Sequence, residues 1–162
     1  RYGSFKDYKE SPLLAAQMNL GFPVEIEGKI YYTLAARNEI MIFDGKRTRL
    51  IRYPIRFEPK KPRVENKKEI QNGKTSIFTK VILSPLCKDA AVSGDKRLII
   101  ARYKSAEEEA RVELIKLGSD GQKIGLIAEV QDFIRMAVDP KSARLYYLAE
   151  SDEGWHLAAL QL

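Results

Sequence analysis

The sequence predicts an all-β fold of antiparallel meanders with one short helix near the N-terminus. Three units of the chain repeat an apolar strand, a polar break and a second apolar strand, and turns rich in Gly, Asp and Pro link them. The second and third units start 47 residues apart, at Leu98 and Leu145. A four-stranded propeller blade spans about 40–50 residues. We therefore expect about three propeller-like blades; an open β-sandwich is the alternative. The paired strands are 30–35 with 39–44, 98–103 with 111–117, and 145–150 with 155–162.

The 162 residues are long enough for one domain with a core of its own, and 44% of them are hydrophobic. We expect a single β domain over residues 1–162. Its predicted segments are an N-terminal helix or turn (1–23), a blade-like unit (24–55), a basic loop with an extra strand (56–88), a second blade-like unit (89–130) and an incomplete third unit (131–162).

The predicted helix begins at Ser11-Pro12, because Ser is a good N-cap and Pro suits the first helical position. Asn19-Leu20-Gly21 ends it. Strands are expected from Val24 onward, with a tight turn at Glu27-Gly28-Lys29 and a later strand over 48–55.

Residues 57–74 are predicted to form a long loop. Pro59, Pro62, the many bases and Asn72-Gly73 all oppose a continuous strand. Loops of this length are functional or mobile. A strand over 75–83 follows and stops at Ser84-Pro85.

The second unit is predicted to contain strands over 89–92, 97–103, 111–117 and 123–130. An acidic triplet, Glu107-Glu108-Glu109, lies in its break, where we expect it to cap a hairpin in water. The third unit is predicted to contain strands over 134–138, 144–149 and 155–162.

The positive charge of the chain is concentrated in one segment. Residues 46–80 contain twelve Lys and Arg but three Glu, so this segment carries +9 while the whole chain carries +6. It is either a binding surface for an anionic partner such as a nucleic acid, or a solvated edge strand and loop. Aromatic residues that could stack on bases are sparse in it. The candidate binding residues are Arg49, Arg52, Arg56, Lys60, Lys61, Arg63, Lys67 and Lys68.

No motif for nucleotide binding, nucleophilic catalysis or zinc binding occurs in the sequence. Cys87 is the only cysteine and His156 the only histidine, so neither an intrachain disulfide nor an ordinary zinc site is expected. We expect Cys87 to be a small buried hydrophobe, and His156 to be packed or half-exposed on a sheet. No catalytic residue, metal ligand or cofactor is predicted, and every apolar run is too short to span a bilayer.

The run from Met136 to Tyr147 has a hydrophobic-Val-Asp segment followed by Leu-Tyr, which resembles the inner strands of bacterial propellers. The start Gly3-Ser4-Phe5-Lys6-Asp7-Tyr8, the short helix and the strand over 39–44 are similar to the TolB-like six-bladed β-propellers common in Bacteroidetes. This resemblance implies an exported protein, periplasmic or on the cell surface. It implies no catalytic residue.

Three blades cannot close a ring, and six would need about 250–300 residues. We therefore expect the chain to be part of a longer propeller, or two copies to complete one ring. The predicted function is a non-enzymatic module that binds a protein, another ligand or itself through its loops and sheet edge, with the loop 56–74 as the main contact. The alternatives are polyanion binding through 46–80, and a propeller hydrolase or lyase whose site is completed by further blades.

Overall fold

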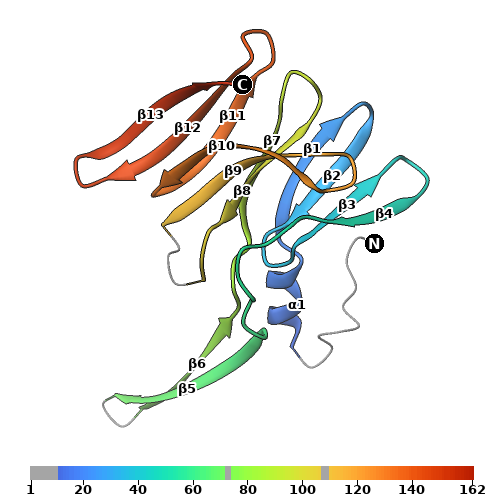
Figure 1. The fold of residues 1–162 in the computed structure, drawn as a ribbon. Coiled ribbons are helices and arrows are strands. Elements are labelled where there is room, and N and C mark those ends of the chain that lie inside the picture. The colour runs from blue at the N-terminus through green and yellow to red at the C-terminus, as the bar shows by residue number, and fades with distance from the viewer. Residues whose placement is uncertain (1–10, 72–73, 107–109) are drawn as a thin grey trace.

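The computed structural model describes residues 11–71, 74–106 and 110–162, and over these residues the protein is all-β with one short helix (Figure 1). Four antiparallel sheets contain all of the described strands. The predicted fold class is confirmed. The predicted start at Gly3 to Tyr8 and the acidic triplet 107–109 lie outside the described residues.

The helix α1 (Pro12–Met18) begins where the sequence predicts. Ser11 is its N-cap, and the Ser11 hydroxyl accepts a hydrogen bond from the backbone N–H of Leu14 at 3.2 Å. Asn19 caps the C-terminal end. The buried side chains of α1 are Leu14, Ala15 and Met18, and they fix the helix to the rest of the chain.

The first sheet is a four-stranded meander in the order β1-β2-β3-β4. It starts at Gly21, three residues before the predicted Val24, and its last strand ends at Arg52 rather than at Ile55. Arg52 pairs with Glu39, the first residue of the neighbouring strand, so the last strand has no partner strand beyond that residue. The strands are β1 (Gly21–Ile26), β2 (Lys29–Leu34), β3 (Glu39–Phe43) and β4 (Thr48–Arg52).

The second sheet is a four-stranded meander in the order β7-β8-β9-β10, and the third is a three-stranded meander in the order β11-β12-β13. Both follow the predicted units closely. The strands are β7 (Cys87–Val92), β8 (Leu98–Tyr103), β9 (Arg111–Leu117), β10 (Lys123–Gln131), β11 (Phe133–Asp139), β12 (Arg144–Ser151) and β13 (Gly154–Gln161).

The second sheet lies between the other two, and both of its faces are buried (Figure 1). Ile100 and Ile115 face the first sheet and pack with Ile40 and Ile42, among others. Ile99 and Leu114 face the third sheet, whose Leu145 is among the side chains that cover them. The first strand of the middle sheet, β7, contacts both β1 and β11. The three sheets therefore form a stack in which the first strands adjoin.

The prediction of a long loop over 57–74 is wrong. Residues Arg63–Gln71 form strand β5, which pairs along its whole length with β6 (Lys74–Ile82) as a separate two-stranded hairpin. The hairpin projects from the sheet stack beside α1 (Figure 1). Its base is fixed because Val64 and Val81 pack against Leu14 and Met18 of α1. The prolines that suggested a loop, Pro59 and Pro62, precede the strand and leave it intact.

The single cysteine and the single histidine differ in burial. Cys87 is 2% exposed in the core between the first two sheets, as predicted. His156 lies on a sheet as predicted, in β13, where it is exposed and not packed. His156 pairs with Ala149 and so lies on the side of the sheet that faces the middle sheet, but β13 is the edge strand of the third sheet and the His156 side chain stays in water there.

Candidate functional site

The first sheet has an apolar side that no other sheet of the described chain covers. Its buried side carries Ile40 and Ile42, so the alternate positions of the same strand point outward. The paired positions of β2 and β4 place further apolar side chains on this outward side. We call this surface the β1–β4 outer face; it consists of Ile30, Tyr32, Met41, Phe43 and Leu50.

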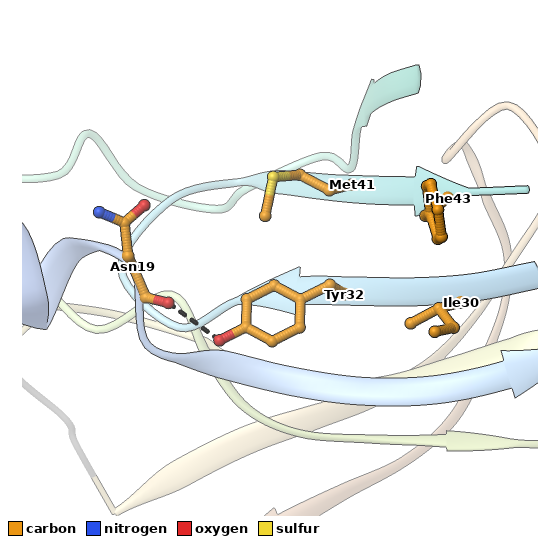
Figure 2. Close-up of a pocket in the computed structure, with 5 residues that line it drawn as sticks. All are labelled: Asn19, Ile30, Tyr32, Met41 and Phe43. Carbon is orange, nitrogen blue, oxygen red and sulfur yellow. Dashed lines mark hydrogen bonds between the residues drawn. The ribbon is translucent and has the colours of Figure 1, made fainter. Parts of the chain in front are cut away.

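A shallow groove of about 370 Å³ lies on the β1–β4 outer face. Figure 2 shows Tyr32 and Ile30 along β2 beside Met41 and Phe43 along β3. Asn19 closes one end, and its backbone carbonyl accepts a hydrogen bond from the Tyr32 hydroxyl at 2.9 Å. The groove is thus almost wholly apolar, with its one tyrosine hydroxyl already satisfied by the protein.

The third sheet has a comparable outward side. Leu145 and Ala149 are buried against the middle sheet, so the alternate residues Tyr146 and Leu148 of β12 point away from it. Opposite Leu148 on β13 is Leu157, and Trp155 lies two residues before it on the same side. We call this surface the β11–β13 outer face; it consists of Tyr146, Leu148, Trp155 and Leu157.

The exposure of these side chains is high for residues of their size. Trp155 is 72% exposed and Leu157 is 69% exposed, while Ile30 and Leu50 on the other face are each 47% exposed. Soluble proteins seldom leave large contiguous apolar patches in water, and such patches mark interaction sites. The two outer faces lie at opposite ends of the three-sheet stack (Figure 1).

The predicted basic residues do not form one surface. Arg49 and Arg52 lie on the edge strand β4, as the sequence suggested. Arg49 donates to the backbone carbonyl of Ser119 at 3.3 Å, and Arg52 is 3.4 Å from the carboxylate of Glu39. Both cations therefore contact groups of the chain itself.

Arg56 has a structural partner far away in the sequence. Its guanidinium donates to Glu113 Oε1 at 2.9 Å, and Arg102 donates to Glu113 Oε2 at 2.7 Å. Arg102 also donates to the carbonyl of Pro54. Arg102 and Glu113 are almost completely buried in the middle sheet, so this cluster attaches the segment after β4 to β8 and β9.

The remaining candidates lie near or on the hairpin. Lys60 and Lys61 line a polar pocket of about 220 Å³ that also contains Glu39. On β5, Arg63 is 2.7 Å from Glu65 and Lys67 is 2.8 Å from Glu69, and Lys68 is exposed on the same strand. The eight predicted residues are thus distributed over the edge of the first sheet, the connecting segment and the hairpin. Carboxylates pair with four of them: Arg52, Arg56, Arg63 and Lys67.

The ionisable groups of the core have structural partners. Burial raises the pKa of the Cys87 thiol and of the Tyr53 hydroxyl, so both groups stay neutral. Burial also raises the pKa of Asp89, although its carboxylate accepts hydrogen bonds from the backbone N–H groups of Met136 and Ala90. Asp89 thereby links β7 to β11. Across the described ranges, no group of three His, Cys, Asp or Glu side chains could hold a metal ion.

Sequence reasoning missed both outer faces and the Arg102–Glu113 pair. The alternation of Trp155, Leu157 and Ala159 was visible as a signal, but which side is buried depends on the neighbouring sheet. The contact between Arg56 and Glu113 spans 57 positions and has no signature in the spacing.

No protein-family profile matches this chain, and no curated protein matches it at a significant level. In the part of the chain that the structure describes, no helix is long and apolar enough to cross a membrane.

Proposed function

We propose that this chain is a non-enzymatic interaction module of propeller-like architecture, and that two copies associate through their outer faces. The β1–β4 outer face of one copy docks on the β11–β13 outer face of the other. The observation that carries the proposal is the exposure of large apolar side chains at both ends of the stack, with Trp155 at 72% and Leu157 at 69%.

The propeller-like architecture is supported by the order of the strands. Each of the three large sheets is a meander that starts at one edge, and β7 contacts both β1 and β11. Blades of a propeller have the same arrangement, with the first strands around a common axis. The separate hairpin β5–β6 is an insertion between the first and second of these sheets.

The docking of one outer face on the other is supported by the two interfaces already present within the chain. In both interfaces, alternate aliphatic and aromatic residues of neighbouring sheets pack face to face, as Ile99 and Phe133 do with no exposed surface. A second copy can form the same face-to-face packing, because its β11–β13 outer face can lie against the β1–β4 outer face of the first copy. Each buried Leu or Ile contributes about 1.5–3 kcal/mol.

The charges at the rims are compatible with this docking. The outward positions around the first face include Glu25 and Arg52, and those around the second include Arg144 and Glu150. Each face therefore carries both acids and bases, and neither has the single-sign charge that would repel its partner.

The experiment is sedimentation analysis with parallel tryptophan fluorescence over a wide range of protein concentration. Trp155 is the only tryptophan, so its emission reports directly on the β11–β13 outer face. We expect the mass to double with concentration, while the emission shifts to shorter wavelength and acrylamide quenching falls. A chain that stays monomeric with a solvent-exposed Trp155 at every concentration refutes the proposal.

Substitutions distinguish a specific contact between the two outer faces from nonspecific hydrophobic association. Leu50→Lys and Leu157→Lys each remove one face and are expected to abolish self-association. Leu126→Lys is the matched control, because Leu126 is also 47% exposed but lies on β10, outside both outer faces. Mixing the Leu50→Lys and Leu157→Lys variants restores one intact interface, so the mixture is expected to associate. A mixture that stays monomeric contradicts docking between unlike faces.

A further inference from the structure

We infer that the free edge of β6 is a second interaction site, which binds an extended acidic peptide as an added β-strand. This site is separate from the two outer faces. The hairpin β5–β6 is a two-stranded sheet, so β6 pairs with β5 along one side only. Among the described residues, no backbone hydrogen bond connects the other side of β6 to another element.

The projecting half of the hairpin has few of the contacts that usually stabilise such a ribbon. Two isolated strands are marginally stable in water, and only the base of this pair packs against α1. Farther out, Ile70 is 68% exposed, Ile77 is 69% exposed and Phe78 is 53% exposed. A third strand would cover part of this surface and supply hydrogen bonds to the unpaired backbone groups.

The charge of the edge identifies the kind of strand. β6 contains Lys74 and Lys80 and no acidic residue. On β5, two cations have carboxylate partners on the same strand, whereas no ion pair within the described ranges involves either lysine of β6. Carboxylates opposite Lys74 and Lys80 would form favourable cross-strand pairs.

The alternation of side chains along β6 also determines where the bound peptide needs apolar residues. Lys74, Phe78 and Lys80 point to one side of the hairpin and Ile77 to the other. A matching strand therefore has acidic residues at its ends and apolar residues near its centre. A phosphate backbone would satisfy the lysines but would leave Ile77 and Phe78 uncovered, which favours a peptide over a nucleic acid.

The test measures fluorescence anisotropy of a labelled peptide, Glu-Thr-Val-Val-Thr-Thr-Glu, with added protein. In an antiparallel pair, the N–H groups of alternate peptide residues point toward β6. Two versions of the peptide carry N-methyl groups on the two alternate sets. We expect one version to lose binding and the other to bind as the parent does. Equal binding of both versions, or no binding of the parent, refutes strand addition.

Variants of the protein test the role of the lysines. Lys74→Glu with Lys80→Glu is expected to weaken peptide binding about tenfold or more, because two cross-strand pairs become repulsive. Lys46→Glu with Lys141→Glu is the control, since it changes the net charge equally at exposed turns elsewhere. An equal loss in the control pair shows that only the overall charge matters and contradicts the site.

Two further measurements separate this site from other binding events. The Leu157→Lys variant, which lacks an outer face, is expected to bind the peptide as well as the unaltered chain does. Failure of self-association and failure of the β6 site are therefore distinguishable. An unrelated DNA duplex that binds more tightly and displaces the peptide would assign the hairpin to nucleic acid and overturn the inference.

Discussion

Glu113 shows how one buried carboxylate can organise the contact between two sheets. Its side chain is fully buried, and burial by itself would raise the pKa of Glu113. Hydrogen bonds from Arg56 and Arg102 outweigh burial, so the pKa of Glu113 is below its ordinary value. The carboxylate stays ionised and holds the segment after β4 against the middle sheet.

Glu113→Gln is expected to destabilise the protein by about 3 kcal/mol, because Arg102 then keeps a buried charge without a carboxylate partner. Urea unfolding at neutral pH measures this loss. Glu129→Gln is the matched control: Glu129 is 2.7 Å from Lys104 but 48% exposed, so its loss should cost less than about 1 kcal/mol. Equal losses in both variants would contradict a special role for the buried pair.

The same comparison predicts a dependence on pH. The folded-state pKa of Glu113 is lowered, so its stabilising contribution is complete above the unfolded-state value of about 4.3 and is lost as the pH falls. The stability difference between the unaltered chain and Glu113→Gln should therefore shrink below that pH. A difference that grows in acid would show that the pKa of Glu113 is raised instead.

At the scale of elements, the turn between β9 and β10 shows how packing against another strand adds a second constraint to a turn glycine. Gly121 has φ of +87°, and a Cβ at this position would lie 2.3 Å from the carbonyl oxygen of Arg52 on β4. Gly45, in the turn between β3 and β4, has a similar φ of +93° but open space around it. Both positions require a left-handed backbone conformation, but only at Gly121 would a Cβ also collide with a neighbouring strand.

Gly45→Ala is expected to cost about 1–2 kcal/mol, the strain of a left-handed residue with a Cβ. Gly121→Ala should cost about 1–3 kcal/mol more, because the turn must also move away from Arg52. Thermal or urea unfolding of the two variants measures the difference. Equal losses would mean that the turn and β4 separate without cost.

The strands could be predicted from sequence where their own residues form a run of apolar side chains. Strands of the second and third sheets were located because buried residues such as Ile99, Leu114 and Leu145 sit in apolar runs. β5 was missed because Val64 and Ile70 are the only apolar residues in its nine positions. β5 is a strand because it pairs with β6 along its whole length. The sequence did contain a hairpin signal, because Asn-Gly is common in the turn between two paired strands.

The candidate surfaces were less predictable than the fold for a related reason. The basic residues were correctly recognised as a cluster in sequence, but Arg56 contacts Glu113 across 57 positions. The apolar side chains of Leu50 and Trp155 become candidates once the buried side of each sheet is known. An isolated sequence does not specify which of two alternating sides another sheet will cover.

At the scale of the whole molecule, the middle sheet joins two cores that have no buried residue in common. Adjacent residues of β9 belong to different cores, since Ile115 faces the first sheet and Leu114 faces the third. A strand cannot lose its packing on one side and keep its geometry on the other. The three stacked sheets should therefore unfold as one cooperative unit, whereas the projecting hairpin can open alone.

This cooperativity can be tested with Trp155, which lies on the third sheet, far in the stack from the core that contains Ile115. Ile115→Ala removes packing between the first two sheets and is expected to cost about 2–5 kcal/mol. If the stack is one unit, the urea transition reported by Trp155 fluorescence shifts by this full amount and coincides with the transition seen by circular dichroism. Ile124→Ala is the control, because Ile124 is 57% exposed and should move neither transition. The measurements are made at concentrations where the chain is monomeric. A Trp155 transition that stays in place while the circular dichroism shifts would show that the third sheet folds independently of the first two.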